Sequence, residues 1–233
     1  MKRLLSLLLL ISLIPIIPIA GAAQDNTNNT ALYELQNFHI LDEGSALDAE
    51  QEITRAEYLK MVISMMGLSD TDSGNGQQLY HDVPVTHWAF QYISWGTQLN
   101  LVSGYGDQTF QPEQAIHWNE AVSILVKALG YDVVAKQAGS YPAGYMQTAA
   151  TMGLFKSVEV RDAMLQRGEA VQLIYNALDV EIMEITTENG QTVYKTENGN
   201  TYRNRLMYHN GEELIKAQGQ ITANEYTWLV APN

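Results

Sequence analysis

The stretch Ile53-Thr-Arg-Ala-Glu57 begins a short amphipathic segment whose pattern recurs twice further along the chain. The other copies begin at Ile116-His-Trp-Asn-Glu120 and Leu165-Gln-Arg-Gly-Glu169. In all three copies apolar residues follow the glutamate at helical spacing, which predicts a helix with one buried stripe. In the first two copies a glycine lies ten residues after the glutamate, where it favours a left-handed helix stop. This repetition predicts a chain built from three related helical units.

The glutamate of each copy has an expected structural role. Thr54 and Glu57 form the pattern of a capping box, in which each side chain accepts a hydrogen bond from the other residue's amide. His117 and Gln166 replace Thr54 in the other copies and are poorer N-caps. Because carboxylate pairs perform acid and base chemistry on sugars, the glutamates also suggest a glycosidase. Their fixed position after each cap favours capping over catalysis.

The first 23 residues predict export from the cytoplasm. Lys2 and Arg3 precede a largely apolar run, which ends in small residues with candidate cleavage sites after Ala22 or Ala23. This order is typical of a secretory signal peptide. Two prolines interrupt the run and argue against a retained membrane anchor. We therefore expect a secreted protein with no membrane partner after signal cleavage.

Composition excludes several classes of site and partner. The sequence contains no cysteine, which excludes disulfides and thiolate metal sites. Its histidines are scattered without metal-ligand spacing, and no phosphate loop or nucleophile elbow is present, so we expect no metal and no cofactor. Without the signal peptide, 11 basic face 26 acidic side chains, a net charge of about −15. That charge disfavours nucleic acid and anionic lipid as partners.

Each capped helix is preceded by another apolar segment, and the repeating unit is therefore helix, loop, helix. These segments are residues 31–41, 88–102 and 145–155. The small and polar stretches 69–78 and 135–140 are expected to be joints between units. From Glu181 onward, alternating apolar residues and Asn-Gly pairs predict strands and turns, with the exposed edges of an incomplete domain.

The second copy contains further motifs, namely Asp82-Val83, His87-Trp88-Ala89, Gly104-Tyr-Gly-Asp107 and Pro112. Together with the first copy's Ile-Thr-Arg-Ala-Glu, they make the chain similar to S-layer homology domain proteins of clostridial or related Gram-positive-type bacteria. The resemblance implies a mainly α fold, a pseudo-threefold bundle of three helix-loop-helix repeats followed by a small β-rich segment. The expected divisions are a signal peptide (1–23), a flexible leader (24–30), repeats at 31–70, 79–134 and 141–180, and a β-rich C-terminal segment (181–233).

The same resemblance implies a function at the cell wall. Grooves between S-layer homology repeats hold an anionic, typically pyruvylated, secondary cell-wall polysaccharide attached to peptidoglycan, and so anchor the host protein noncovalently. Surface-layer proteins are further candidate partners, and no enzymatic activity is implied. The alternative is a structural or assembly protein of the cell surface whose degenerate repeats no longer bind glycan.

The resemblance places the ligand-binding arginine at Arg55 and, in copy three, at Arg167. At the first helical position, a guanidinium and the free helix amides together suit a carboxylate. The pattern alone is more typical of a solvated surface arginine, and the resemblance favours the ligand-binding role. Copy two carries Trp118 instead, which cannot neutralise an anion but is suited to stacking on a sugar face.

Trp88 and the loop containing Gly104, Tyr105 and Asp107 are expected to form a groove wall, in which Asp107 accepts hydrogen bonds from sugar hydroxyls. The alternative is that Trp88 is a core aromatic residue and the loop a tight turn. Gln111 stands where the family often has arginine, and copies one and three lack the loop. We therefore expect at most one or two competent grooves.

Overall fold

The structure is a computed structural model that describes residues 22–42, 47–68, 78–188 and 191–209. Within these ranges the chain forms eight helices and one two-stranded antiparallel sheet, so the expected mainly α fold with a small β segment is confirmed at that level. The predicted signal peptide, apart from its last two residues, lies outside the described residues. No helix in the described ranges has the length and apolar character needed to cross a membrane.

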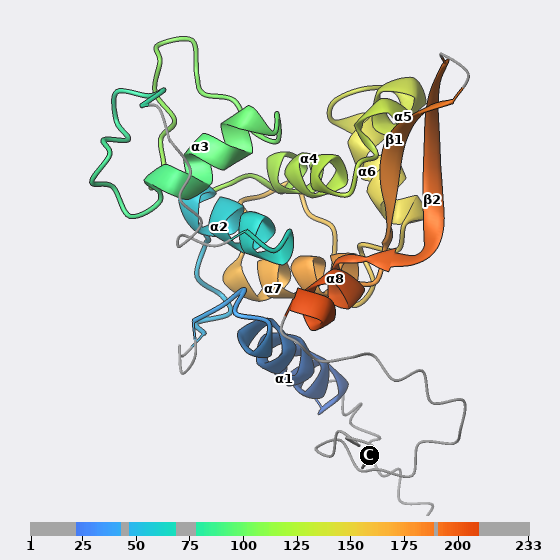
Figure 1. The fold of residues 1–233 in the computed structure, drawn as a ribbon. Helices are drawn as coiled ribbons and strands as arrows, with labels where there is room; N and C mark the ends of the chain where they lie inside the picture. Colours follow the sequence, from blue (N-terminus) through green and yellow to red (C-terminus); the bar gives the residue numbers. More distant parts are fainter. Residues whose placement is uncertain (1–21, 43–46, 69–77, 189–190, 210–233) are drawn as a thin grey trace, which may run out of the picture.

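The elements follow one another as Figure 1 shows. In chain order they are α1 (Ala22–Asn37), α2 (Arg55–Met65), α3 (Phe90–Gln98), α4 (Trp118–Ala128), α5 (Asp132–Ala138), α6 (Ala143–Thr151), α7 (Arg167–Ala177), β1 (Glu181–Glu188), β2 (Gln191–Thr201) and α8 (Tyr202–His209).

Helices α2, α4 and α7 begin where the recurring signature predicts. Thr54 and Glu57 form the expected capping box at α2. The amide of Gln166 donates to Glu169 Oε2 over 2.8 Å at the start of α7. After α2 and α4, Gly67 and Gly130 adopt φ angles of 82° and 87°, the left-handed region that glycine enters without strain.

The residues that precede these three helices form a closed ring of backbone hydrogen bonds. The amide of Ile53 donates to Leu165 O over 3.0 Å, that of Leu165 to Ile116 O over 2.8 Å, and that of Ile116 to Ile53 O over 3.0 Å. All three side chains are buried, so the ring passes through the core. Each helix start is thereby fixed by the other two.

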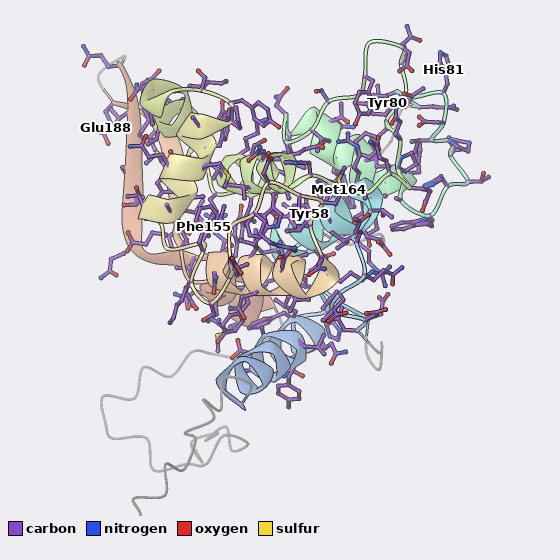
Figure 2. All side chains as sticks on the ribbon, turned by 180° about the vertical axis from the view of Figure 1, so that it is seen from behind. Tyr58, Tyr80, His81, Phe155, Met164 and Glu188 are labelled. Carbon is purple, nitrogen blue, oxygen red and sulfur yellow. The ribbon has the colours of Figure 1, made fainter. Side chains whose placement is uncertain are left out.

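The remaining helices pack across units. Helix α3 of the second unit packs mainly against α2 of the first, α6 of the third packs against α4 of the second, and α1 of the first packs against α7 of the third. The core lies between these pairs, with Tyr58 of α2 among its fully buried side chains (Figure 2). These helix pairs, which join residues distant in the sequence, bury their apolar stripes against one another.

Three sequence-based expectations about local structure are wrong. The polar leader at 24–30 lies within α1, whose buried Ala31 and Leu35 hold the helix against the core. The expected joint at 135–140 is largely helix α5, which the Asp132–Lys136 ion pair (2.6 Å) stabilises. In the expected β-rich segment (181–233), residues 202–209 form α8 instead of a strand, and residues 210–233 lie outside the described residues. Most of the joint expected at 69–78 lies outside the described residues.

The C-terminal hairpin and α8 pack against the helical units. The amide of Met183 in β1 donates to Leu129 O over 2.9 Å, and the Tyr202 hydroxyl donates to Ala128 O over 2.6 Å. Arg203 pairs with Asp179 at 2.6 Å and with Glu34 of α1. These contacts join the described part of the C-terminal segment to the end of α4, to the residues that follow α7 and to α1.

Candidate functional site

The first residue of each capped helix bonds to the glutamate of the next unit. An Arg55 nitrogen pairs with Glu120. The Trp118 indole nitrogen donates to Glu169 Oε2 over 3.1 Å, and Arg167 donates to Glu57 Oε1 over 2.5 Å. We call these contact regions junction 1–2, junction 2–3 and junction 3–1. Glu57 and Glu169 thus combine the predicted capping role with a bond between units.

The helix amides at these positions are not free. The amides of Arg55, Trp118 and Arg167 donate to Gln114 O, Ala163 O and Gln51 O over 2.8, 3.0 and 2.8 Å. Each acceptor lies in the segment before the capped helix of a neighbouring unit. The expectation that free amides join an arginine in facing a carboxylate is therefore wrong, because pairing between units uses them.

Arg55 is buried in junction 1–2, with only 3% of its surface exposed. Its Nε donates to Phe110 O over 3.0 Å, and its guanidinium carbon lies 5.1 and 4.6 Å from the ring centres of Tyr105 and Phe110. Burial lowers the pKa of Arg55, although nearby polar groups oppose the shift. The solvated-surface interpretation is wrong for Arg55, since protein groups surround its charge.

A groove of about 360 Å³ lies at junction 1–2 beside the buried arginine. Gly104 and Tyr105 of the second unit's loop line it, together with Tyr141 from the α5–α6 connection. Lys127 of α4 also lines the groove, and burial lowers its pKa. Tyr141 and Lys127 were not predicted as site residues, because neither belongs to the motifs that carry the resemblance.

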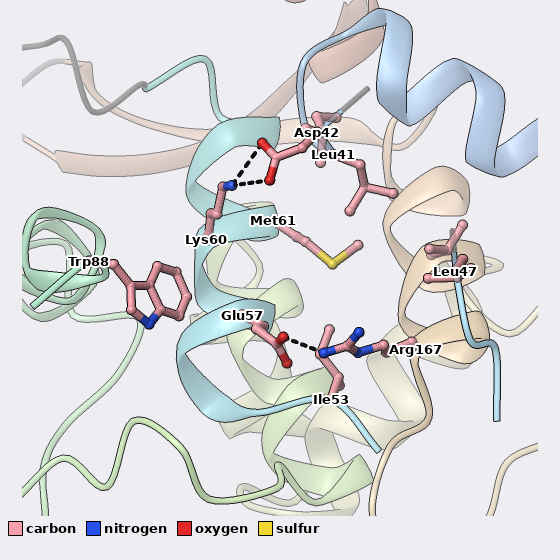
Figure 3. A pocket seen from close by; sticks show the side chains of 11 residues that line it. Leu41, Asp42, Leu47, Ile53, Glu57, Lys60, Met61, Trp88 and Arg167 are labelled. Atoms are coloured by element: carbon pink, nitrogen blue, oxygen red, sulfur yellow. Dashed lines mark hydrogen bonds and ion pairs between the residues drawn. The ribbon is translucent and has the colours of Figure 1, made fainter. Parts of the chain in front are cut away.

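A second groove, of about 290 Å³, lies at junction 3–1 (Figure 3). Its apolar lining is formed by Ile40, Leu41, Leu47, Ile53, Met61 and Val171. Arg167 pairs with Glu57, Lys60 pairs with Asp42 at 3.1 Å, and Glu57 and Lys60 lie between Arg167 and Trp88 in this view.

Trp88 contributes to junction 3–1 with half of its surface exposed, at 50%. Its interpretation as a core aromatic residue is therefore wrong. Tyr105 and Gly104 line the other groove, so the expectation that Trp88 and this loop share one wall is also wrong. The two features separate because Trp88 just precedes α3, which packs against α2 of the first unit.

Asp107 is engaged within its own loop. Its Oδ1 accepts hydrogen bonds from the Thr109 hydroxyl over 2.6 Å and the Thr109 amide over 3.0 Å, and these bonds lower the pKa of Asp107. The amide of Tyr105 donates to Thr109 O over 2.8 Å, which closes a tight turn. The turn interpretation is confirmed for Asp107, which does not line the groove at junction 1–2.

Junction 2–3 is closed by Trp118, which has no exposed surface. Its ring centre lies 6.1 Å from that of Phe155. The Nε and one Nη of Arg161 donate to Glu169 Oε1 over 2.9 and 2.5 Å. Arg161 thus provides, at this junction, the positive charge that the signature arginine provides at the other two. The expectation that Trp118 stacks on a sugar is wrong, and Arg161 was missed because it precedes the third signature.

The described residues contain no cluster of three or more His, Asp or Glu side chains suited to a metal ion. The arrangement at the junctions instead combines cations, exposed aromatic faces and an apolar floor. These groups recognise acidic and amphipathic ligands by binding.

Comparison with known proteins gives the class of the chain. Residues 79–117 match the family model of the S-layer homology domain. The chain is 26% identical to the Middle cell wall protein of Brevibacillus brevis over 180 residues, covering 77% of this chain and 16% of that protein. It is 28% identical to the Cellulosome-anchoring protein of Acetivibrio thermocellus over 152 residues (58% and 34%), and 26% identical to the Surface layer protein of Brevibacillus choshinensis over 137 residues (58% and 12%).

These similarities define a protein of the bacterial cell surface. Residues 79–117 are similar to the S-layer homology domain, as the motifs of the second unit predicted. The chain spans about a third or less of the length of these relatives.

Proposed function

We propose that this chain anchors its host protein noncovalently to the cell wall by binding an anionic, pyruvylated secondary cell-wall polysaccharide between three S-layer homology repeats. The proposed repeats are residues 31–70, 79–134 and 141–180. Their arrangement about a pseudo-threefold axis is supported by the closed hydrogen-bond ring and by helix packing from each unit onto the next. Surface-layer proteins are further proposed partners.

The observation that carries this proposal is the groove at junction 3–1. Arg167 and Lys60 lie there above an apolar floor that includes Met61, and Trp88 contributes an exposed ring. A pyruvate ketal presents a carboxylate and a methyl group on the same carbon. Such a group suits the cations and the floor together, while a sugar ring suits the face of Trp88.

The ion pairs in this groove leave capacity for a ligand. Asp42 is exposed, and exposed pairs such as Lys60–Asp42 contribute only ~0–1 kcal/mol, so a ligand carboxylate displaces Asp42 at little cost. Arg167 has five N–H donors, of which Glu57 takes one. The negative net charge of the chain opposes binding weakly, because charges beyond ~8 Å are screened at physiological salt.

A structural role without glycan binding is the second candidate, and the closed junction 2–3 favours it. There Trp118 is buried, and Arg161 holds Glu169 through two of its N–H donors. This candidate predicts that binding to cell walls is independent of their secondary polysaccharide. A non-enzymatic role is common to both candidates, because Glu57 and Glu169 serve as caps and bonds between units.

Sedimentation with purified cell walls tests the proposal. We expect the mature chain to sediment with intact walls and to stay in solution with walls stripped of their secondary polysaccharide. Arg167→Ala combined with Lys60→Ala should weaken binding at least tenfold. Lys156→Ala combined with Lys195→Ala removes two cations elsewhere and should leave binding unchanged. Equal binding to intact and stripped walls would overturn the proposal and favour the structural role.

A further inference from the structure

The C-terminal hairpin has an uncharged outer face. Its strands pair antiparallel, with Ile185 of β1 directly opposite Tyr194 of β2, and both side chains are exposed, at 63% and 41%. Because side chains two positions apart share a face, the other residues of this face are Met183, Thr187, Thr192 and Thr196. The charged pair Glu184 and Lys195 lies on the opposite face. An apolar and hydroxyl-bearing surface is therefore turned outward.

The backbone of β2 forms a free edge of this sheet. The Met183 amide donates to Leu129 O over 2.9 Å, so the outer edge of β1 faces the end of α4, and Figure 1 shows β2 on the far side of β1 from α5. In an antiparallel pair, opposite residues that point outward alternate with residues that bond to each other. Thr196, the partner of Met183, therefore points outward, as do Tyr194 and Thr192. Their backbone groups bond to no other residue within the described ranges.

The sequence beyond α8 contains a segment that suits this edge. In Tyr226-Thr-Trp-Leu-Val230, Tyr226, Trp228 and Val230 alternate with Thr227 and Leu229, and no residue is charged. Aromatic and branched residues at this period favour a strand. An unpaired strand edge is a template for such a segment, because its N–H and C=O groups are already aligned.

The connection between α8 and this segment is long enough to reach β2. Helix α8 follows β2 directly, and its eight residues span ~12 Å. Sixteen residues separate His209 from Tyr226, and an extended chain of that length spans ~50 Å. The 11 residues of β2 span only ~36 Å. A tethered segment is also held at an effective concentration on the order of millimolar, which favours it over a second copy of the chain.

We propose that residues 226–230 add to the free edge of β2 as an antiparallel third strand. Trp228 lies opposite Tyr194 on the outer face, and Leu229 lies opposite the half-buried Val193 on the other face. Such aromatic and branched cross-strand pairs stabilise sheets. The strand is antiparallel because the connection begins at α8, beside the end of β2, and needs no crossover to the far end of the hairpin.

Amide hydrogen exchange, followed by NMR on the mature chain, tests this strand. We expect the amides of Tyr194 and Thr196 to exchange at least tenfold more slowly in the unaltered chain than in the Trp228→Pro variant, which lacks the N–H that donates to Tyr194 O. Gln218→Pro, a matched change in the connection, should leave both amides slow. Fast exchange in the unaltered chain, or the same slow exchange in Trp228→Pro, would overturn the proposal.

A designed disulfide distinguishes this segment from a second copy. The chain has no cysteine, so Val193→Cys combined with Leu229→Cys forms only the bond under test. We expect a monomer with an intramolecular disulfide. Val160→Cys with Leu229→Cys places the first cysteine at an exposed residue of the third unit and should oxidise at least tenfold more slowly. A covalent dimer as the main product, or equal oxidation rates, would overturn the proposal. Neither measurement involves the cell wall, so both are independent of the proposed function.

Discussion

The grooves at junctions 1–2 and 3–1 use the same signature arginine in different ways. Arg55 is buried against Tyr105 and Phe110, whereas the Arg167 side chain is 27% exposed beside an open groove. The covering loops differ: 14 residues separate Leu101 from Ile116, but 12 separate Ile40 from Ile53. Tyr105 and Phe110 of the second unit's loop cover Arg55, so this arginine stabilises the fold.

The largest expected difference between the junctions is in stability. Arg55→Ala should destabilise the chain by ~3–5 kcal/mol, because it leaves Glu120 and buried carbonyl groups without their partner. Arg167→Ala should cost only ~1 kcal/mol or less, because its pair with Glu57 is partly solvated. Denaturant unfolding of both variants measures the difference. Equal losses of stability in the two variants would contradict the conclusion that Arg55 stabilises the fold more strongly than Arg167 does.

The loop that covers Arg55 can be disturbed at one glycine. A Cβ atom at Gly104 would lie 2.2 Å from a Tyr80 ring atom and 2.6 Å from Thr109 O. Gly104→Ala should therefore cost ~1–3 kcal/mol of stability through overpacking. Gly106→Ala is the matched control, since its Cβ would meet no atom within 4 Å. Denaturant unfolding curves of the two variants measure the difference, and similar losses of stability would refute the explanation.

Structural features that are determined by neighbouring residues in the sequence could be predicted, and features that depend on distant residues could not. The starts of α2, α4 and α7 follow from caps and periodicity within each signature, and these were predicted correctly. The burial of Arg55 and Trp118 depends on groups distant in the sequence, such as Phe110 and Phe155, so the signature alone misassigned their surroundings. Lys127 and Tyr141 gain significance only when two units meet in one groove.

The smallest expected effect concerns the pH dependence of Lys127. Burial lowers the folded-state pKa of Lys127 below the ordinary lysine value. The charged, partly buried lysine therefore destabilises the folded state at low pH, and this destabilisation is relieved as the pH rises through the folded-state pKa toward ~10.4. Lys127→Met should therefore raise stability slightly at pH 7, by ~0.5 kcal/mol or less, with a smaller gain near pH 10. Thermal unfolding at both pH values checks the sign. A gain that grows with pH would contradict it.

We infer that a unit binds the wall through an open groove, and that the signature arginine without such a groove is not sufficient. Saturation binding of Arg167→Gln and Arg161→Gln to purified walls tests it most directly. Both arginines are partly exposed, at 27% and 37% of their side chains, and both pair with a signature glutamate, but Arg161 lies at the closed junction. We expect at least a tenfold loss of affinity for Arg167→Gln and no change for Arg161→Gln. Equal losses, or no loss in either variant, would contradict it.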